Sequence, residues 1–123
     1  MKKIMIVDDN YLSAEGIEKN VDWEALNAEI AHICYNGTSA IEAMKKESVD
    51  LIISDIEMPD LDGISMSRQA LNINPMVKII LISAYDKFEY ARRALLLGAL
   101  DYIEKPLDYA YLIQKVKNDF VLD

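Results

Sequence analysis

The chain has 123 residues, with 13 basic and 21 acidic side chains and a formal net charge of −8. This length supports one domain with an ordinary hydrophobic core. The acidic balance argues against nucleic-acid contact by this domain, because phosphate contacts need basic patches. The one cysteine, Cys34, excludes an internal disulfide, and we expect it to be a small buried side chain in a reducing compartment.

Neither end of the sequence indicates a membrane segment or a targeting signal. The N-terminal MKKIMIVDD has two lysines and then only four apolar residues, which is too short for a signal peptide. No stretch approaches the roughly 20 apolar residues of a membrane span. We therefore expect a cytoplasmic protein that does not contact a membrane.

Five short apolar runs alternate with five segments of helical periodicity. The runs are rich in β-branched residues and nearly free of charge, which is typical of strands covered on both faces. This alternation predicts one α/β domain over residues 1–123, with a parallel sheet between layers of helices. The strands are expected at residues 4–7, 30–35, 49–54, 77–82 and 100–103, and the helices at 11–20, 39–47, 62–71, 87–97 and 109–120.

Helical spacing also predicts which side chains face the core. Residues 21–27 form a loop or helix extension whose Trp23 and Leu26 pack onto the body, and Gly98 ends the helix at 87–97. In helix 39–47 the expected inward side chains are Ile41 and Met44, and in helix 109–120 they are Leu112, Val116 and Phe120. In helix 87–97 they are Phe88, Ala91, Ala94 and Leu95, so that Tyr90, Leu96 or Leu97 would be partly exposed.

Polar side chains follow four of the five predicted strands. Asp8 and Asp9 follow the first, Asp55 the third, Ser83 the fourth and Lys105 the fifth. Singly, an aspartate here is commonly a helix cap, the serine a turn hydroxyl and the lysine a solvated side chain. Parallel strands, however, bring all their carboxyl ends to one edge of the sheet, where open α/β sheets bind ligands. We therefore expect these five side chains to converge.

Such a cluster has a definite chemistry. Three carboxylates without histidine or cysteine are hard oxygen ligands that suit Mg²⁺ rather than Zn²⁺. A carboxylate beside Mg²⁺ and a lysine is equipped to attack a phosphoryl group and form an acyl phosphate. Asp55, at the end of a buried strand, is the candidate for this attack.

Four motifs in this order resemble the receiver domain of two-component response regulators over essentially the full chain. They are VDD at residues 7–9, SDIEMPDLDG at 54–63, ISA at 82–84 and DYIEKP at 101–106. The resemblance implies a flavodoxin-like (βα)5 three-layer sandwich with strand order 2-1-3-4-5. It also implies that the domain accepts a phosphoryl group from a sensor histidine kinase. Such a domain is not an enzyme, and at most it catalyses its own phosphorylation and dephosphorylation.

The resemblance assigns a phosphorylation site and a magnesium site. Asp55 matches the phosphoacceptor, and Asp9 and Asp55 match the direct Mg²⁺ ligands. Asp8 would act on the metal through water, and Glu57 would contribute its backbone carbonyl.

It also assigns the groups that respond to phosphorylation. Ser83 matches the switch hydroxyl, Tyr102 the aromatic residue that moves with it, and Lys105 the cation that pairs with the phosphate. We expect a cis peptide bond between Lys105 and Pro106. Gly63 is expected to relieve a tight turn.

Some positions depart from the common pattern or refine it. Ser83 stands where threonine is commoner in this family. Glu57 and Tyr85 occupy positions that influence how fast the acyl phosphate hydrolyses, and the sequence leaves open whether they speed or slow it. Residues 21–27, together with 83–107, resemble receivers attached to AraC-type DNA-binding output domains. This implies transcription control through a domain outside this chain.

The expected output surface comprises helix 87–97, strand 100–103 and helix 109–120. Apolar residues there indicate either core packing with scattered exposure or a face for a partner or homodimer.

Two alternatives to a receiver domain remain open. A Mg²⁺-dependent phosphatase of the haloacid-dehalogenase type would use Asp55 with Glu57 as proton shuttle, but Pro59 stands where it needs threonine and no cap fits. A non-phosphorylated pseudo-receiver conflicts with the complete set of five side chains.

Overall fold

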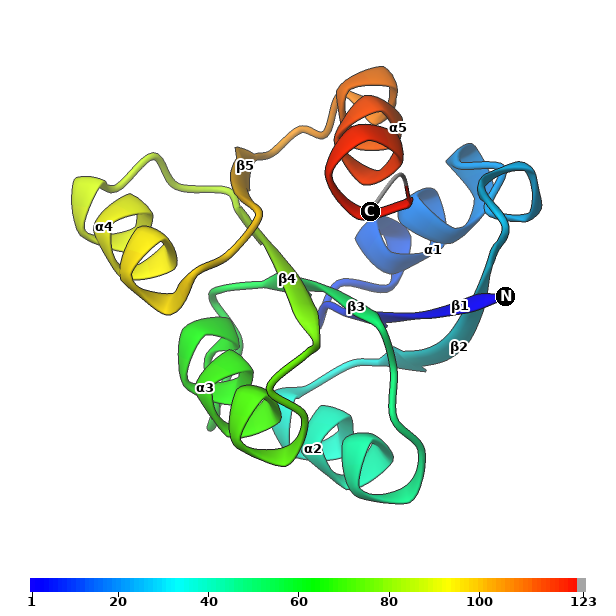
Figure 1. Ribbon diagram of the computed structural model, residues 1–123. Coiled ribbons are helices and arrows are strands. Elements are labelled where there is room, and N and C mark those ends of the chain that lie inside the picture. The colour runs from blue at the N-terminus through cyan, green and yellow to red at the C-terminus, as the bar shows by residue number, and fades with distance from the viewer. Residues whose placement is uncertain (122–123) are drawn as a thin grey trace.

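Five parallel strands form the central layer of the protein, and the computed structural model describes residues 1–121 (Figure 1). Their spatial order is β2-β1-β3-β4-β5, as predicted. The strands are β1 (Lys2–Val7), β2 (Ala28–Cys34), β3 (Leu51–Asp55), β4 (Lys78–Ser83) and β5 (Asp101–Glu104). The helices are α1 (Tyr11–Asn20), α2 (Gly37–Lys46), α3 (Gly63–Ile73), α4 (Phe88–Leu97) and α5 (Tyr109–Val116), with a 3₁₀ turn at Glu24–Leu26 and a π turn at Lys117–Val121.

The helices form two layers around the sheet. Side chains of α2, α3 and α4 pack with one face of the strands, and those of α1 and α5 with the other. On β1, Met5 and Val7 face the first group while Ile4 and Ile6 face the second, and none of the four is accessible to solvent. This explains the uninterrupted apolar runs, because a strand covered on both faces has no polar side. The predicted fold class is confirmed.

The predicted and observed bounds of several elements differ, because sequence signals are weak where an element begins or ends. β1 and β2 each begin two residues before the predicted start, and β3 begins at Leu51 rather than at residue 49. The α-helical part of α5 ends at Val116, before the π turn. The core predictions for this helix hold, since Leu112, Val116 and Phe120 are buried, and Cys34 and Trp23 are buried as predicted. The Trp23 indole nitrogen donates to the carbonyl oxygen of Ile17 at 3.3 Å.

Four of the helices begin at a side chain that accepts hydrogen bonds from their first turn. These N-caps are Asn10, Asn36, Asp62 and Asp108. Such caps satisfy backbone N–H groups that have no partner within the helix. In the part of the chain that the structure describes, α4 differs, because its N-cap residue is Lys87 and no side chain caps it.

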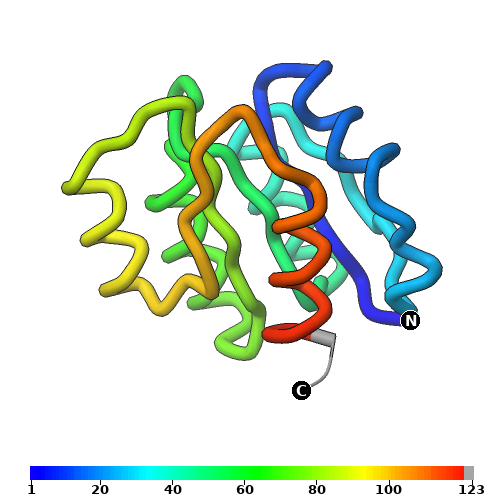
Figure 2. Tube along the Cα trace, turned by 90° about the horizontal axis from the view of Figure 1, so that it is seen from above, coloured from blue at the N-terminus to red at the C-terminus, as the bar shows by residue number. Residues whose placement is uncertain are grey.

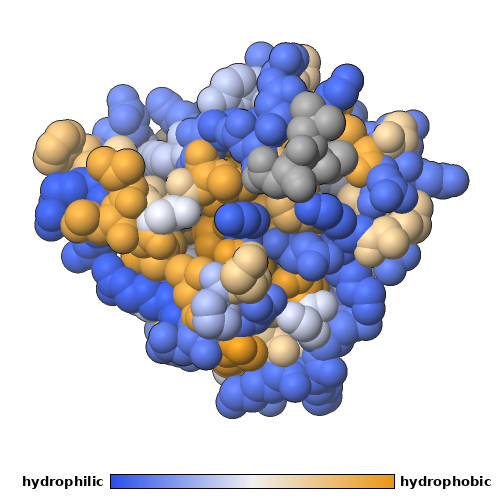
Figure 3. All heavy atoms as spheres, in the orientation of Figure 1, coloured by the Kyte–Doolittle hydropathy of each residue, from blue (hydrophilic) through white to orange (hydrophobic). Residues whose placement is uncertain are grey.

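The predicted inward face of α4 is largely wrong. Ala94 is buried as expected, but the other residues predicted to face inward are exposed to solvent. Tyr90 and Leu97 pack against the core instead. Both stripes are apolar and both have helical spacing, so periodicity could not distinguish them. Hydrophobic side chains therefore gather on the outer surface where α4 lies (Figure 3). The exposed stripe consists of Phe88, Ala91 and Leu95, with Leu96 beside it.

Candidate functional site

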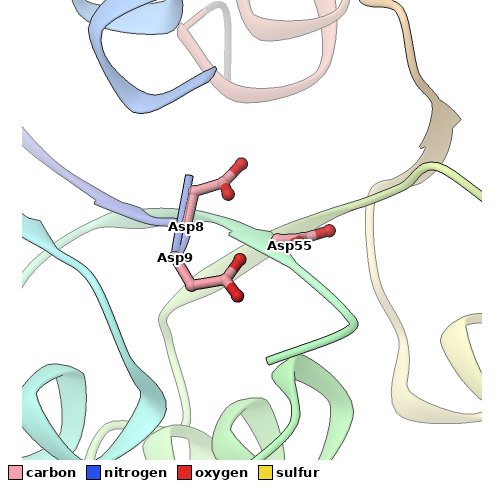
Figure 4. A group of neighbouring side chains, drawn as sticks. All are labelled: Asp8, Asp9 and Asp55. Carbon is pink, nitrogen blue, oxygen red and sulfur yellow. The ribbon is translucent and has the colours of Figure 1, made fainter. Parts of the chain in front are cut away.

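Three aspartates meet at the carboxyl edge of the sheet, along which the loops after the strands lie (Figure 2). Asp8 and Asp9 directly follow β1, and Asp55 is the last residue of the neighbouring strand β3. One carboxylate oxygen from each lies within 4.8 Å of the others (Figure 4). Asp8 and Asp55 are buried, whereas Asp9 is exposed. The predicted convergence of the three carboxylates is confirmed.

Lys105 completes this cluster from the loop after β5. Its ammonium nitrogen lies 3.0 Å from Asp8 Oδ2 and 3.7 Å from Asp55 Oδ1. The Lys105 backbone N–H donates to the Ser83 carbonyl oxygen at 2.8 Å, which places this loop beside the end of β4. The Lys105–Pro106 peptide bond is cis, as predicted. One ammonium thus compensates two buried carboxylates.

The electrostatics of the cluster favour a cation. Burial raises the pKa of Asp55 to about 6, and the negative charges of Asp8 and Asp9 act in the same direction. The Lys105 ammonium and the backbone N–H of Ile56 oppose this rise in pKa. Asp55 is therefore mostly ionised at neutral pH, but as a destabilised anion that a further positive charge would stabilise.

Gly63 lets the loop after Asp55 close tightly. A Cβ at Gly63 would lie 2.1 Å from the carbonyl oxygen of Asp55, and the Gly63 N–H donates to the Ile56 carbonyl oxygen at 2.8 Å. The predicted tight turn lies here, but the residue with a positive φ in it is Asp60, at 70°, and not Gly63. Glycine is needed here because two backbone segments approach closely. The α3 N-cap, Asp62, accepts from the N–H groups of the next turn at 2.9 Å.

Ser83 and Tyr102 both contact the segment between β4 and α4. The buried Ser83 Oγ accepts a hydrogen bond from the Tyr85 N–H at 3.0 Å. The Tyr102 hydroxyl donates to the Tyr85 carbonyl oxygen. The predicted switch residues are therefore linked through the backbone of Tyr85. A hydroxyl that accepts one hydrogen bond still carries its own hydrogen to donate.

One contact between two loops was not predicted from the sequence. The Lys87 ammonium lies 3.8 Å from Glu57 Oε1, which joins the start of α4 to the loop after Asp55. The signal that could have indicated it is a lysine at a helix start, where a small polar residue is preferred.

A parallel sheet of this order with an acidic cluster and a lysine at its carboxyl edge defines a flavodoxin-like α/β domain of the receiver class. Residues 4–117 match the response regulator receiver domain family. The chain belongs to this family.

Similar proteins agree with this assignment. The receiver domain of AraT, a response regulator from Geobacillus stearothermophilus, is 34% identical with a TM-score of 0.86, over 94% of this chain and 92% of that one. The chemotaxis protein CheY of Treponema pallidum is 34% identical over 93% of this chain and 79% of its own length. The transcriptional regulatory protein YesN of Bacillus subtilis is 29% identical over 95% of this chain, which spans only 32% of YesN.

The resemblance to receivers of AraC-type regulators is also confirmed. A two component transcriptional regulator AraC from Clostridium phytofermentans is 31% identical, with a TM-score of 0.78, over 95% of this chain and 90% of that one. Within residues 1–121, no helix has the length and apolar character needed to cross a membrane.

Proposed function

We propose that residues 1–123 form one receiver domain in which Asp55 accepts a phosphoryl group from a sensor histidine kinase in the presence of Mg²⁺. The observation that carries this proposal is the set of three aspartate oxygens within 4.8 Å of one another, with the Lys105 ammonium against two of those side chains. Isolated helix caps would not require such an arrangement. The charges account for both an anionic nucleophile and a cationic contact for the incoming phosphate.

The donor set fits Mg²⁺. All side-chain donors are carboxylate oxygens, which this ion prefers while it retains several waters. Asp9 and Asp55 would bind it directly, with the Glu57 backbone carbonyl as a third ligand. Asp8 already accepts from the Asn10 N–H at 2.9 Å and from Lys105 at 3.0 Å, which fits a role through water. When bound, Mg²⁺ would neutralise charge between the carboxylates and the phosphoryl oxygens.

The protein's own groups account for the transfer step. An Asp55 carboxylate oxygen attacks the phosphorus of a phosphohistidine, so that an O–P bond forms while the N–P bond breaks. The electron pair of the broken bond returns to the imidazole nitrogen. Lys105 would pair with the phosphoryl oxygens, and the Ser83 hydroxyl would donate its hydrogen to one of them.

A groove beside Lys105 suits the kinase as occupant. It has a volume of about 510 Å³ and lies between α1 and the loops that follow β4 and β5. Its position matters because the donor histidine must reach Asp55 from the carboxyl edge of the sheet. Leu12 at its rim is 80% exposed, which would provide apolar contact for a partner. The lining includes Leu12, Ser13, Ala84, Pro106 and Leu107.

Phosphorylation would act by shifting conformational populations. A new charge at Asp55 engages Ser83 and Lys105 in only one of two states, and Tyr85 connects Ser83 to Tyr102. We propose that the response is transmitted on the surface of α4, β5 and α5, by homodimerisation through this face. The exposed Phe88 and Leu95 of α4 support an interaction there.

The wider setting follows from the relatives. YesN and the Staphylococcus aureus protein HptR are transcriptional regulatory proteins, and the chain spans 32% and 44% of their lengths. We propose that the domain controls transcription in the cytoplasm through a DNA-binding domain outside this chain, and that it does not itself contact nucleic acid, since its formal net charge is −8.

The test is labelling with acetyl phosphate and Mg²⁺, followed by intact mass. We expect one phosphoryl adduct on the wild-type protein and none on Asp55→Asn, because the amide cannot act as the nucleophile. Asp60→Asn is the matched control: it removes an acid from the same loop but outside the cluster, and it should label normally. Labelling of Asp55→Asn at the wild-type level would refute the assignment, and chelation of Mg²⁺ should suppress labelling.

An assay of the same protein with a generic phosphate ester distinguishes a receiver from a phosphatase. A phosphatase would use the Glu57 carboxylate as a proton shuttle, but this carboxylate faces the Lys87 ammonium at 3.8 Å. We therefore expect a single slow labelling event and no multiple turnover of a generic phosphate ester. Sustained ester hydrolysis would favour the phosphatase.

A further inference from the structure

The start of α4 has a charge in an unfavourable place. Lys87 occupies the N-cap position, where the partial positive charge of the helix end repels a cation. Within Phe88–Leu97 only Ala94 is fully buried, and Tyr90 and Leu97 pack against the core while partly exposed, so the apolar packing of this helix is limited. A lysine at this position therefore needs compensation from outside the helix.

Three groups surround the Lys87 ammonium. Glu57 Oε1 lies 3.8 Å away, and the ring centroids of Tyr85 and Tyr90 each lie 5.0 Å away, within the range of cation–π contacts. Glu57 Oε1 is itself covered from solvent and has no hydrogen-bond partner among the described residues. The ammonium is consequently the positive charge that faces this covered oxygen, in an ion pair whose two side chains are otherwise partly exposed.

The pair connects two segments that matter to the site. Glu57 follows Asp55 by two residues, and Lys87 follows the segment that Ser83 and Tyr102 hold at Tyr85. That segment is thus tied at one end to the switch hydroxyl and at the other to the loop beside the phosphoacceptor. A displacement of one loop relative to the other therefore acts on this ion pair.

We propose that Lys87 is a positioning residue that ties the first turn of α4 to the loop after Asp55 through Glu57, framed by Tyr85 and Tyr90, and so couples α4 to the state of Asp55. The tether itself is a property of the unphosphorylated protein. Its part in signalling rests on the proposed phosphoacceptor function.

Amide hydrogen exchange of residues 84–90 in the metal-free, unphosphorylated chain tests the tether. Lys87→Met should raise exchange rates there by about two- to fivefold, the range for a partly exposed ion pair. Glu57→Gln should also raise exchange there, by no more than Lys87→Met, which removes the contacts to the two tyrosine rings as well. The double variant should exchange like Lys87→Met, since the ion pair is already lost in that single variant. Lys87→Arg keeps the charge and should exchange like the wild type.

Arg92→Met is the control for loss of a cation on the same helix. The Arg92 guanidinium pairs with Glu89 inside α4 at 2.9 Å, so this change should leave exchange at residues 84–87 unaltered. Unchanged exchange in Lys87→Met, or additive effects of Lys87→Met and Glu57→Gln, would overturn the proposal. So would equal effects of Lys87→Met and Arg92→Met on residues 84–87.

The signalling part is tested with beryllofluoride and Mg²⁺, which imitate the phosphoryl group. The wild-type protein should change its exchange over residues 88–97, and Lys87→Met should show a change smaller by about twofold or more. Acetyl phosphate should still label Asp55 in Lys87→Met. A full-sized exchange response in this variant would overturn the coupling. If the wild-type protein neither labels nor responds, the phosphoacceptor assignment fails, while the metal-free arm still decides the tether.

Discussion

α4 and α5 flank the same strand, β5, but they are held in place by different forces (Figure 1). α5 has an aspartate N-cap and buries Leu112 and Val116 completely. α4 lacks a side-chain cap, buries Ala94, and has Phe88 and Leu95 about four-fifths exposed. Apolar burial does not depend on the charge at Asp55, whereas the ion pair at the start of α4 involves Glu57, in the loop that follows Asp55. α4 is therefore the less firmly packed of the two helices, and it is the one that we propose responds to the site.

The largest expected contrast is between one leucine on each helix. Leu112→Ala should lower the free energy of unfolding by about 3 kcal/mol, because it leaves a cavity in a closed core. Leu95→Ala should change it by less than about 0.5 kcal/mol, because that side chain is 79% exposed. Urea denaturation followed by circular dichroism measures both. Similar losses for the two variants would show that α4 is packed as firmly as α5.

The backbone also differs in how tightly it is packed near the site and at the end of α4, as two glycines show. Gly63→Ala should cost about 2–3 kcal/mol, since its Cβ would lie 2.1 Å from the Asp55 carbonyl oxygen and one backbone segment must move. Gly98→Ala, at the end of α4, should cost about 1 kcal/mol, because φ is +85° but no atom lies within 4 Å of the added carbon. Thermal and urea unfolding of both variants check the order, and a larger loss at Gly98 would contradict it.

The sequence predicted the sheet well because of the way the sheet is buried. Strands covered on both faces have to be apolar throughout, so β1, β3 and β4 are visible as continuous runs. Their parallel arrangement then places Asp8, Asp9, Asp55 and Lys105 at one edge without further information. The roles of these side chains came from the resemblance to receiver domains, not from the spacing.

Features that depend on tertiary contacts were not predictable in this way. α4 has two apolar stripes, and only packing against α3 and the sheet decides which one faces inward. The need for glycine at residue 63 comes from the approach of Asp55, which belongs to another element. Likewise, Glu57 and Lys87 are thirty positions apart in sequence, and their contact exists only once two loops are folded beside each other.

The charge at Asp55 should also affect the stability of the whole fold, including its firmly packed part. The folded-state pKa of Asp55 is about 6, raised from 3.8, so between about pH 4 and pH 6 the folded protein binds more protons here than the unfolded chain. The free energy of unfolding should therefore fall as the pH rises through this window. The full penalty remains above pH 6. A neutral asparagine in place of Asp55 would carry no charge and escape this penalty.

Without metal at pH 7.5, Asp55→Asn should accordingly be more stable than the wild type, by about 1–2 kcal/mol, after allowing for partial screening of the open site by solvent. The difference should disappear near pH 4, where the aspartate is largely protonated in the folded state and about half protonated in the unfolded chain. Added Mg²⁺ should narrow the gap at pH 7.5, because a ligand of the folded wild-type protein stabilises it by mass action. Urea unfolding with a chelator and then with Mg²⁺ measures each step. A wild-type protein that is the more stable of the two in chelator would show that the contact with Lys105 outweighs the burial of the Asp55 carboxylate, and that its charge does not destabilise the fold.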